Sequence, residues 1–208
     1  QNVLNATTAD NAIAENVSEF RVIRRRVNRN ALIDIYLKLE DGDESDKREY
    51  FRHYTSFFKK MGYDTVSFEC CIGDVMPGSG SLGGHVPGVI KTRSDFEKYP
   101  WKEIPDLYFN SYTKDYQILS EIMPDGMKVV GGPGNGIFEC VQDIVGYMDL
   151  CFIAFDDPEL YDDLFKAVGD ITFEIWKRFL DKFSDMYTVC RFGDDLGHKT
   201  STLTSPNV

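Results

Sequence analysis

Two adjacent carboxylates and a histidine follow directly on an apolar stretch near the end of the sequence. The segment RFGDDLGHKTSTLTSP, residues 191–206, places Asp194, Asp195 and His198 just after MYTVC. Two carboxylates in a partly buried site can share a proton or bind a cationic ligand group, and a histidine can donate a proton. Consecutive side chains point differently, so we expect one aspartate to enter a site and the other to cap the loop or pair with a base. The alternatives are solvated loop acids and a structural histidine.

A glutamate interrupts an otherwise apolar run earlier in the chain. Glu69 lies within FECCI, and a carboxylate in a buried strand must be paired, metal-bound or neutralised. We therefore predict that Glu69 is a functional acid or base. The alternative is a structural tie between the strand end and a neighbouring arginine or backbone amide. Cys70 and Cys71 are adjacent, so they are expected on opposite faces of the strand as small core residues.

A glycine-rich loop separates a predicted strand from a predicted helix. This loop, GGPGNG at 131–136, contains Gly132 and Asn135. The dinucleotide-binding spacing fails because its third glycine falls on Glu139, and the Gly-Lys-Ser/Thr of a nucleoside-triphosphate loop is absent. Three interpretations stay open: phosphate binding at the helix N-terminus, close approach of the backbone to another ligand, and a structural turn. No His/Cys group has zinc-ligand spacing, so no metal site is predicted in this chain.

Hydrophobic periodicity predicts the elements that position these residues. Strands are expected over 63–72, 127–132 and 186–192, and helices over 8–36, 45–61, 111–123, from about 137, and over 158–183. Ser94–Glu97 is interpreted as a capping box, Asp156 or Asp157 as the cap of the last helix, and the Gly/Pro/Ser loop 73–88 as functional or mobile.

Repeated strand–loop–helix units with near-continuous apolar strands are typical of a parallel sheet covered by helices. Ligands of such folds bind beyond the C-terminal ends of the strands. The fold class is therefore α/β. We expect Glu69, the glycine loop and the Asp194 loop to meet at one edge of the sheet.

Composition narrows the classes of partner. The chain has 208 residues and a formal net charge of −11, which argues against a nucleic-acid or anionic-membrane surface. No apolar run approaches the roughly 18 residues of a membrane span, and no signal peptide is recognisable. Five cysteines without a CxxC pair fit reduced thiols. We therefore predict a cytoplasmic protein. The partner expected from the loops at the strand ends is a small-molecule substrate.

Several stretches, taken in order, resemble the uroporphyrinogen decarboxylase superfamily, nearest its methyltransferase-like branch that works with corrinoid proteins. The likeness is carried by MGYDTVSFE (61–69), VVGGPGNGIFECVQDIVGYMDL (129–150), DDPELYDDLFKAVGD (156–170) and DDLGHKT…SP (194–206). Members of that superfamily are (β/α)₈ TIM barrels. The resemblance implies that residues 45–208 form about the first three βα units of such a barrel, after an N-terminal helical segment at 1–44. A homo-oligomer or a completing C-terminal half is expected to cover the open sheet edge.

The resemblance also implies an enzyme, with methyl transfer in a corrinoid and thiol system as the reaction. Zinc and a corrinoid protein are implied by the resemblance only. From their positions at the strand ends, we predict Glu69 and Asp194 as catalytic residues and Gly132, Asn135, Asp195 and His198 as substrate-binding residues.

Two other functions stay open. In the decarboxylases a catalytic aspartate lies in a Phe-Ser-Asp sequence, and the matching stretch of this chain is Phe68-Glu69-Cys70. The decarboxylases also have a serine after the third strand, and this chain has Asp194 at that position. The first alternative is a lyase that decarboxylates a porphyrinogen or another carboxylate-rich substrate. The second is a non-catalytic half-barrel that binds a ligand or a partner.

Overall fold

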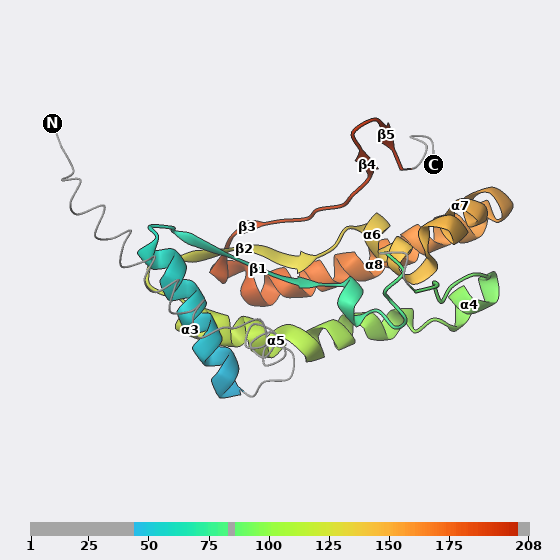
Figure 1. Cartoon of the computed structure of the whole chain (residues 1–208). Helices are drawn as coiled ribbons and strands as arrows, with labels where there is room; N and C mark the ends of the chain where they lie inside the picture. The colour runs from blue at the N-terminus through green and yellow to red at the C-terminus, as the bar shows by residue number, and fades with distance from the viewer. Residues whose placement is uncertain (1–43, 83–85, 204–208) are drawn as a thin grey trace. The chain divides into compact units, whose positions relative to one another are not determined.

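The computed structural model describes residues 44–82 and 86–203 and has an α/β fold with a three-stranded parallel sheet (Figure 1). The sheet order is β1-β2-β3, with β1 at Thr65–Cys71, β2 at Lys128–Gly134 and β3 at Tyr187–Cys190. Strands β2 and β3 run parallel, with Gly131 opposite Cys190. Each strand lies in or overlaps a segment predicted as a strand, so the α/β class is confirmed. The helix predicted over 8–36, and nearly all of the predicted segment 1–44, lie outside the described residues.

Six α-helices accompany the sheet in the described part of the chain. They are α3 (Glu44–Lys60), α4 (Arg93–Lys98), α5 (Ile104–Ile122), α6 (Ile137–Val145), α7 (Tyr147–Asp156) and α8 (Pro158–Phe183). The described chain also has three short 3₁₀ turns: η1 (Gly73–Val75), η2 (Trp101–Glu103) and η3 (Ser184–Met186). Two short strands, β4 (Gly197–His198) and β5 (Ser201–Thr202), form a small antiparallel pair. No described helix combines the length and apolar character needed to cross a bilayer.

Local capping chemistry explains where several helices begin and end. The capping box of α4 is formed by Thr92 and Asp95, so the prediction of Ser94 with Glu97 was wrong by two residues. At α8 the carboxylate of Asp157 accepts from the Leu160 amide at 2.9 Å, which settles the choice between two candidate caps. Gly146, at φ +86°, ends α6 and separates it from α7, a break that the apolar periodicity concealed.

The chain divides into two compact units. The first contains residues 44–66 and 115–128 of the described chain. In it Lys47 Nζ contacts Asp115 Oδ1 at 2.7 Å, and Lys59 Nζ donates to the Asp125 carbonyl at 2.6 Å. The apolar side of α3 is only partly buried: Phe51 is buried, whereas Met61, directly after the helix, is 47% exposed.

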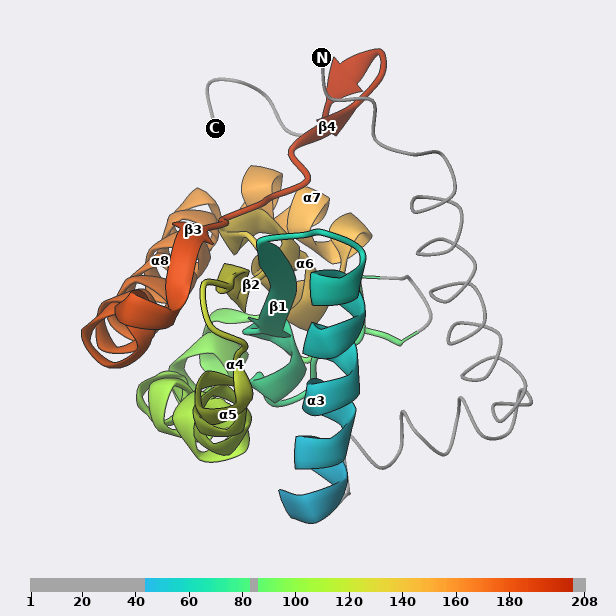
Figure 2. The same cartoon turned by 90° about the vertical axis from the view of Figure 1, so that its left-hand side faces the viewer.

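The second unit, residues 67–114 and 129–208 with the gaps given above, contains most of the sheet and the core. Helix α8 lies beside β2 and β3 in both views (Figures 1 and 2). The rings of Phe179 and Tyr187 lie 5.0 Å apart in this layer, and the Tyr187 hydroxyl donates to the Phe68 carbonyl at 3.0 Å. Helices α6 and α7 pack against α8, with Ile144, Leu150 and Leu164 buried.

Strand β2 is buried along most of its length, as its apolar sequence predicts, but β1 and β3 are not buried on both faces. In β1, Ser67 and Glu69 are exposed while Cys70 is buried. In β3, only Tyr187 is buried, and Thr188, Val189 and Cys190 are exposed. Alternation along β1 thus gives one covered and one open face.

The Gly/Pro/Ser loop is attached to the end of α6 on both sides of its undescribed residues 83–85. Asp143 Oδ1 accepts from the Gly80 and Leu82 amides at 2.8 and 2.9 Å. Beyond the gap, the Val89 and Ile90 amides donate to the Ile144 carbonyl at 2.8 and 3.1 Å. These bonds hold the described parts of the loop close to the helix.

Candidate functional site

Polar groups from the ends of all three parallel strands meet at one edge of the second unit's sheet. Backbone hydrogen bonds join the C-terminal ends of the strands. The Ile72 amide donates to the Gly134 carbonyl at 3.2 Å, and the Arg191 amide donates to the Gly131 carbonyl at 2.9 Å. The loops that follow the strands are further linked by the side chains of Asn135 and Asp194. The expected meeting of the three loops is therefore confirmed.

Asp194 occupies the N-terminus of α6. Its Oδ2 accepts from the Phe138 amide at 2.9 Å, and its Oδ1 accepts from the Glu139 amide at 3.1 Å. These amides have no partner within the helix, and the helix dipole favours a negative charge beside them. A Cβ at Gly136 would lie 2.0 Å from Asp194 Cγ, so glycine provides the space for the carboxylate. The helix N-terminus considered for a phosphate thus holds the chain's own anion.

Asn135 links the first and second loops. Its Oδ1 accepts from the Gly73 amide at 3.2 Å, and its Nδ2 donates to Glu139 Oε2 at 3.4 Å. Asn135 is the one non-glycine residue with positive φ, +67°, in the described chain. Asparagine tolerates this conformation better than most residues, and such strained positions often lie at functional sites.

Glu69 and Arg191 form an ion pair across the open face. Glu69 Oε1 lies 3.4 Å from Arg191 Nε, and the two side chains are 29% and 67% exposed. This ion pair agrees with the alternative interpretation of Glu69, in which it ties the strand end to an arginine. The Glu69 carboxylate is not enclosed in the core. Pairs this exposed contribute roughly 0–1 kcal/mol, so either partner can exchange the other for a ligand at little cost.

The thiol of Cys71 lies with these polar side chains at the ends of the strands. Cys71 is half-buried, and a Cβ at Gly134 would lie 3.3 Å from its sulfur. Burial, followed by the charges of Asp74, Glu69 and Glu139, raises the pKa of Cys71 to about 11. The thiol is therefore protonated at neutral pH and is a weak nucleophile. Cys70 is buried on the other face, as expected for adjacent strand residues.

The remaining predicted residues lie apart from this group or contribute less to it. Gly132 faces the helix layer, where a Cβ would lie 2.8 Å from Trp176 Cη2. Asp195 is exposed, and the backbone of His198 pairs with Ser201 in the small hairpin. The structure therefore unites Glu69, Asn135 and Asp194 but does not bring Gly132 to them.

Sequence reasoning missed three members of the group: Cys71, Glu139 and Arg191. Glu139 carried a usable signal, because it stands three residues after the helix N-cap Gly136 and accepts from that residue's amide at 3.3 Å. Arg191 directly follows a strand, but nothing in the sequence pairs it with Glu69.

The described residues do not fit the zinc that the family resemblance implies. No cluster of three or more His, Cys, Asp or Glu side chains suited to a metal ion occurs within 44–82 and 86–203.

Asp194→Ala is expected to lower the free energy of unfolding by about 1–3 kcal/mol, because two amides at the start of α6 lose a charged, half-buried acceptor. Denaturant titration followed by circular dichroism measures the loss. The matched control is Asp195→Ala, since Asp195 is exposed and no described residue bonds its carboxylate. Equal stability of the two variants would contradict the capping role.

Comparisons with protein-family models, with curated proteins and with solved structures each found no match to this chain.

Proposed function

We propose that this chain provides the first βα units of a (β/α)₈ barrel enzyme resembling the uroporphyrinogen decarboxylase superfamily, with methyl transfer to a thiol as its reaction. The observation that carries the proposal is the meeting of Glu69, Arg191, Asn135 and Asp194 at the C-terminal edge of parallel strands. Barrel enzymes bind their substrates at this edge. The open face of β1 supports the same view, because the interior face of a barrel is covered only by its other strands.

Each residue has a distinct role in this proposal. Arg191 binds an anionic group of the substrate, which releases Glu69 from the ion pair to accept a proton from the attacking thiol. Asn135 and Asp194 fix the loops that shape the site, and Asp195 and His198, on the segment after β3, are proposed to contact the substrate. Gly132 supports the site through its packing under Trp176.

Zinc, when bound in members of this superfamily, lowers the pKa of the thiol substrate. The described residues of this chain do not supply its ligands, so their roles are limited to binding and proton transfer. A corrinoid protein is the proposed source of the methyl group.

The test is a turnover assay of the full-length protein with methylcobalamin and 3-mercaptopropionate, a thiol that carries an anionic group for Arg191. The sulfur–methyl bond forms as the cobalt–carbon bond breaks, the electron pair stays on cobalt, and the thiol proton passes to Glu69. We expect methylated thiol above the protein-free rate and a loss of about 10²-fold in Glu69→Gln, the usual size of a general-base contribution. The matched control is Glu174→Gln, an exposed position on α8.

Arg191 favours one alternative, the decarboxylation of a carboxylate-rich substrate. Its guanidinium is 67% exposed at the edge and is suited to a carboxylate. Decarboxylated product from uroporphyrinogen, without methyl transfer, would replace the proposed reaction by this one. Absence of both products would leave the non-catalytic binding role and would overturn the enzymatic proposal for this chain.

A further inference from the structure

Helix α7 presents an apolar face to solvent. Four large side chains on it are exposed: Tyr147 at 40%, Met148 at 63%, Phe152 at 60% and Phe155 at 86%. Cys151, between them, is exposed as well. Exposed apolar residues scattered singly are ordinary, but a contiguous group marks an interaction surface. These five residues form the α7 stripe.

The stripe is continuous on the helix surface. Its members stand at positions i, i+1, i+4, i+5 and i+8, which at 3.6 residues per turn span an arc of about 140°. No charged residue falls within that arc. The opposite side of α7 is fixed, because Leu150 and Ile153 are buried and the helix packs against α8.

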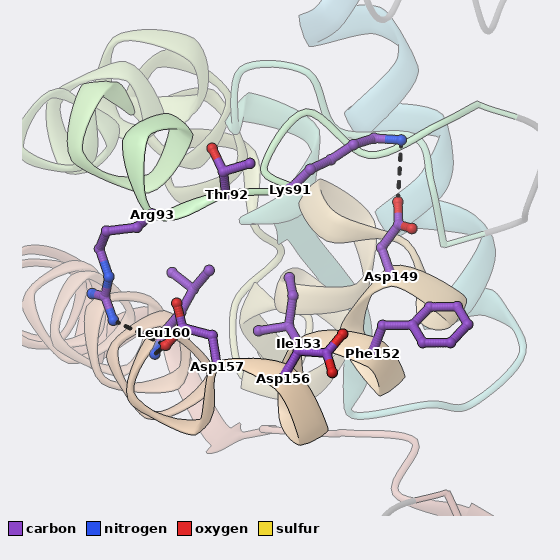
Figure 3. Close-up of a pocket in the computed structure, with 9 residues that line it drawn as sticks. All are labelled: Lys91, Thr92, Arg93, Asp149, Phe152, Ile153, Asp156, Asp157 and Leu160. Carbon is purple, nitrogen blue, oxygen red and sulfur yellow. Dashed lines mark hydrogen bonds and ion pairs between the residues drawn. The ribbon is translucent and has the colours of Figure 1, made fainter.

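A pocket of about 340 Å³ adjoins the stripe at Phe152 (Figure 3). Its apolar wall is formed by Phe152, Ile153 and Leu160. Its polar lining includes Asp149, Asp156 and Asp157 together with Lys91, Thr92 and Arg93. The polar side thus has three carboxylates and two cations, an excess of one negative charge. Together with the exposed aromatic ring and the apolar wall, it suits a long side chain with an aliphatic stem and a cationic end.

The charges around the pocket leave one carboxylate without a counter-ion. Lys91 Nζ contacts Asp149 Oδ2 at 3.3 Å, and Arg93 contacts both Asp157, at 3.7 Å, and Asp163. No residue in the described chain forms a hydrogen bond or ion pair with the Asp156 carboxylate. Asp156 lies one helical turn beyond Phe152, at the border of the stripe. The border of the stripe is therefore acidic, and the two cations of the pocket, Lys91 and Arg93, already form ion pairs with other carboxylates.

We propose that the α7 stripe and its pocket bind a basic amphipathic helix of another protein. Leucine-like residues at i, i+3, i+4 and i+7 of that helix would pack on Phe152 and Phe155, and a lysine or arginine would enter the pocket and reach Asp156. A second copy of the chain would bring another acidic border, and an anionic lipid surface would be repelled by Asp156. This proposal is independent of the proposed reaction.

The probe is a fluorescein-labelled Leu/Lys peptide of about 18 residues, long enough to form a helix, with its leucines along one face. A scrambled peptide of the same composition, whose leucines do not align, controls for charge, and a Leu/Glu helix controls for helicity. Fluorescence anisotropy measures binding to the wild-type chain and to Phe152→Ala/Phe155→Ala. Phe173→Ala is the matched control, because Phe173 is 72% exposed on α8, outside the stripe.

We expect the aligned Leu/Lys helix to bind at least about tenfold more tightly than either control peptide, and the double variant to lose about tenfold or more. Phe173→Ala should bind like the wild type, and Asp156→Asn should weaken binding and reduce its salt dependence. Equal binding of the scrambled peptide, or equal losses in Phe173→Ala, would overturn the proposal. So would a wild-type dimer in sedimentation that dissociates in the double variant, or stripe-dependent binding to phosphatidylcholine/phosphatidylserine vesicles without peptide binding.

Discussion

Replacing Gly131 with alanine is expected to lower the free energy of unfolding by about 3 kcal/mol or more, a loss that few single substitutions reach. A Cβ at this position would lie 2.4 Å from the Phe68 carbonyl oxygen and 2.6 Å from Glu69 Cγ. The carbonyl belongs to the backbone of β1 and also accepts from the Tyr187 hydroxyl, so it cannot move away without disturbing that contact. Gly131 also has φ +133°, where an L side chain is strained.

Gly126→Ala separates the two causes. Gly126 has φ +80°, but no heavy atom lies within 4 Å of the position its Cβ would take. Only the backbone strain should remain, at about 1 kcal/mol. Denaturant unfolding of both variants, followed by circular dichroism, measures the difference. If Gly131→Ala and Gly126→Ala lose the same stability, the close approach of β1 to Gly131 is wrong.

The parts of the fold that follow from local chemistry could be predicted from the sequence. The apolar runs around Val66, Val129 and Tyr187 mark strands because these residues bury one face of a sheet, and Pro158 after Asp157 marks a helix start. The meeting of the loops at one edge followed from the parallel arrangement alone, because parallel strands end on the same side.

The features that the sequence concealed depend on contacts distant in the chain. Glu69 and Arg191 are 122 positions apart, and the acceptor of the α6 amides, Asp194, lies 55 and 56 residues beyond them. The open face of β1 was missed for a related reason: an apolar run does not state whether another element covers each face. The break at Gly146 was not predicted, because the apolar periodicity continues on both sides of it and only its backbone conformation ends the helix.

Gly88→Ala is expected to release the Gly/Pro/Ser loop from α6. A Cβ there would lie 2.0 Å from the Val145 carbonyl oxygen and 2.1 Å from its carbonyl carbon, both backbone atoms of the last residue in the helix. No flexible side chain can move aside to relieve the overlap, so either the loop or the end of α6 must shift. The hydrogen bonds from the Val89 and Ile90 amides to the Ile144 carbonyl would then break. The expected loss of stability is about 3 kcal/mol, from overpacking and the two lost hydrogen bonds.

Hydrogen exchange distinguishes release of the loop from general unfolding, because it reports each segment separately. In Gly88→Ala we expect the Val89 and Ile90 amides to lose protection while amides within α8 keep theirs at low denaturant. Gly193→Ala is the control, since its nearest neighbours are side-chain nitrogens of Arg191 at 3.8 Å and its stability should change little. Unchanged protection at Val89 and Ile90 would mean that the loop does not depend on this contact. The attachment of the loop would then rest on Asp143, whose bonds to Gly80 and Leu82 lie on the other side of the undescribed residues.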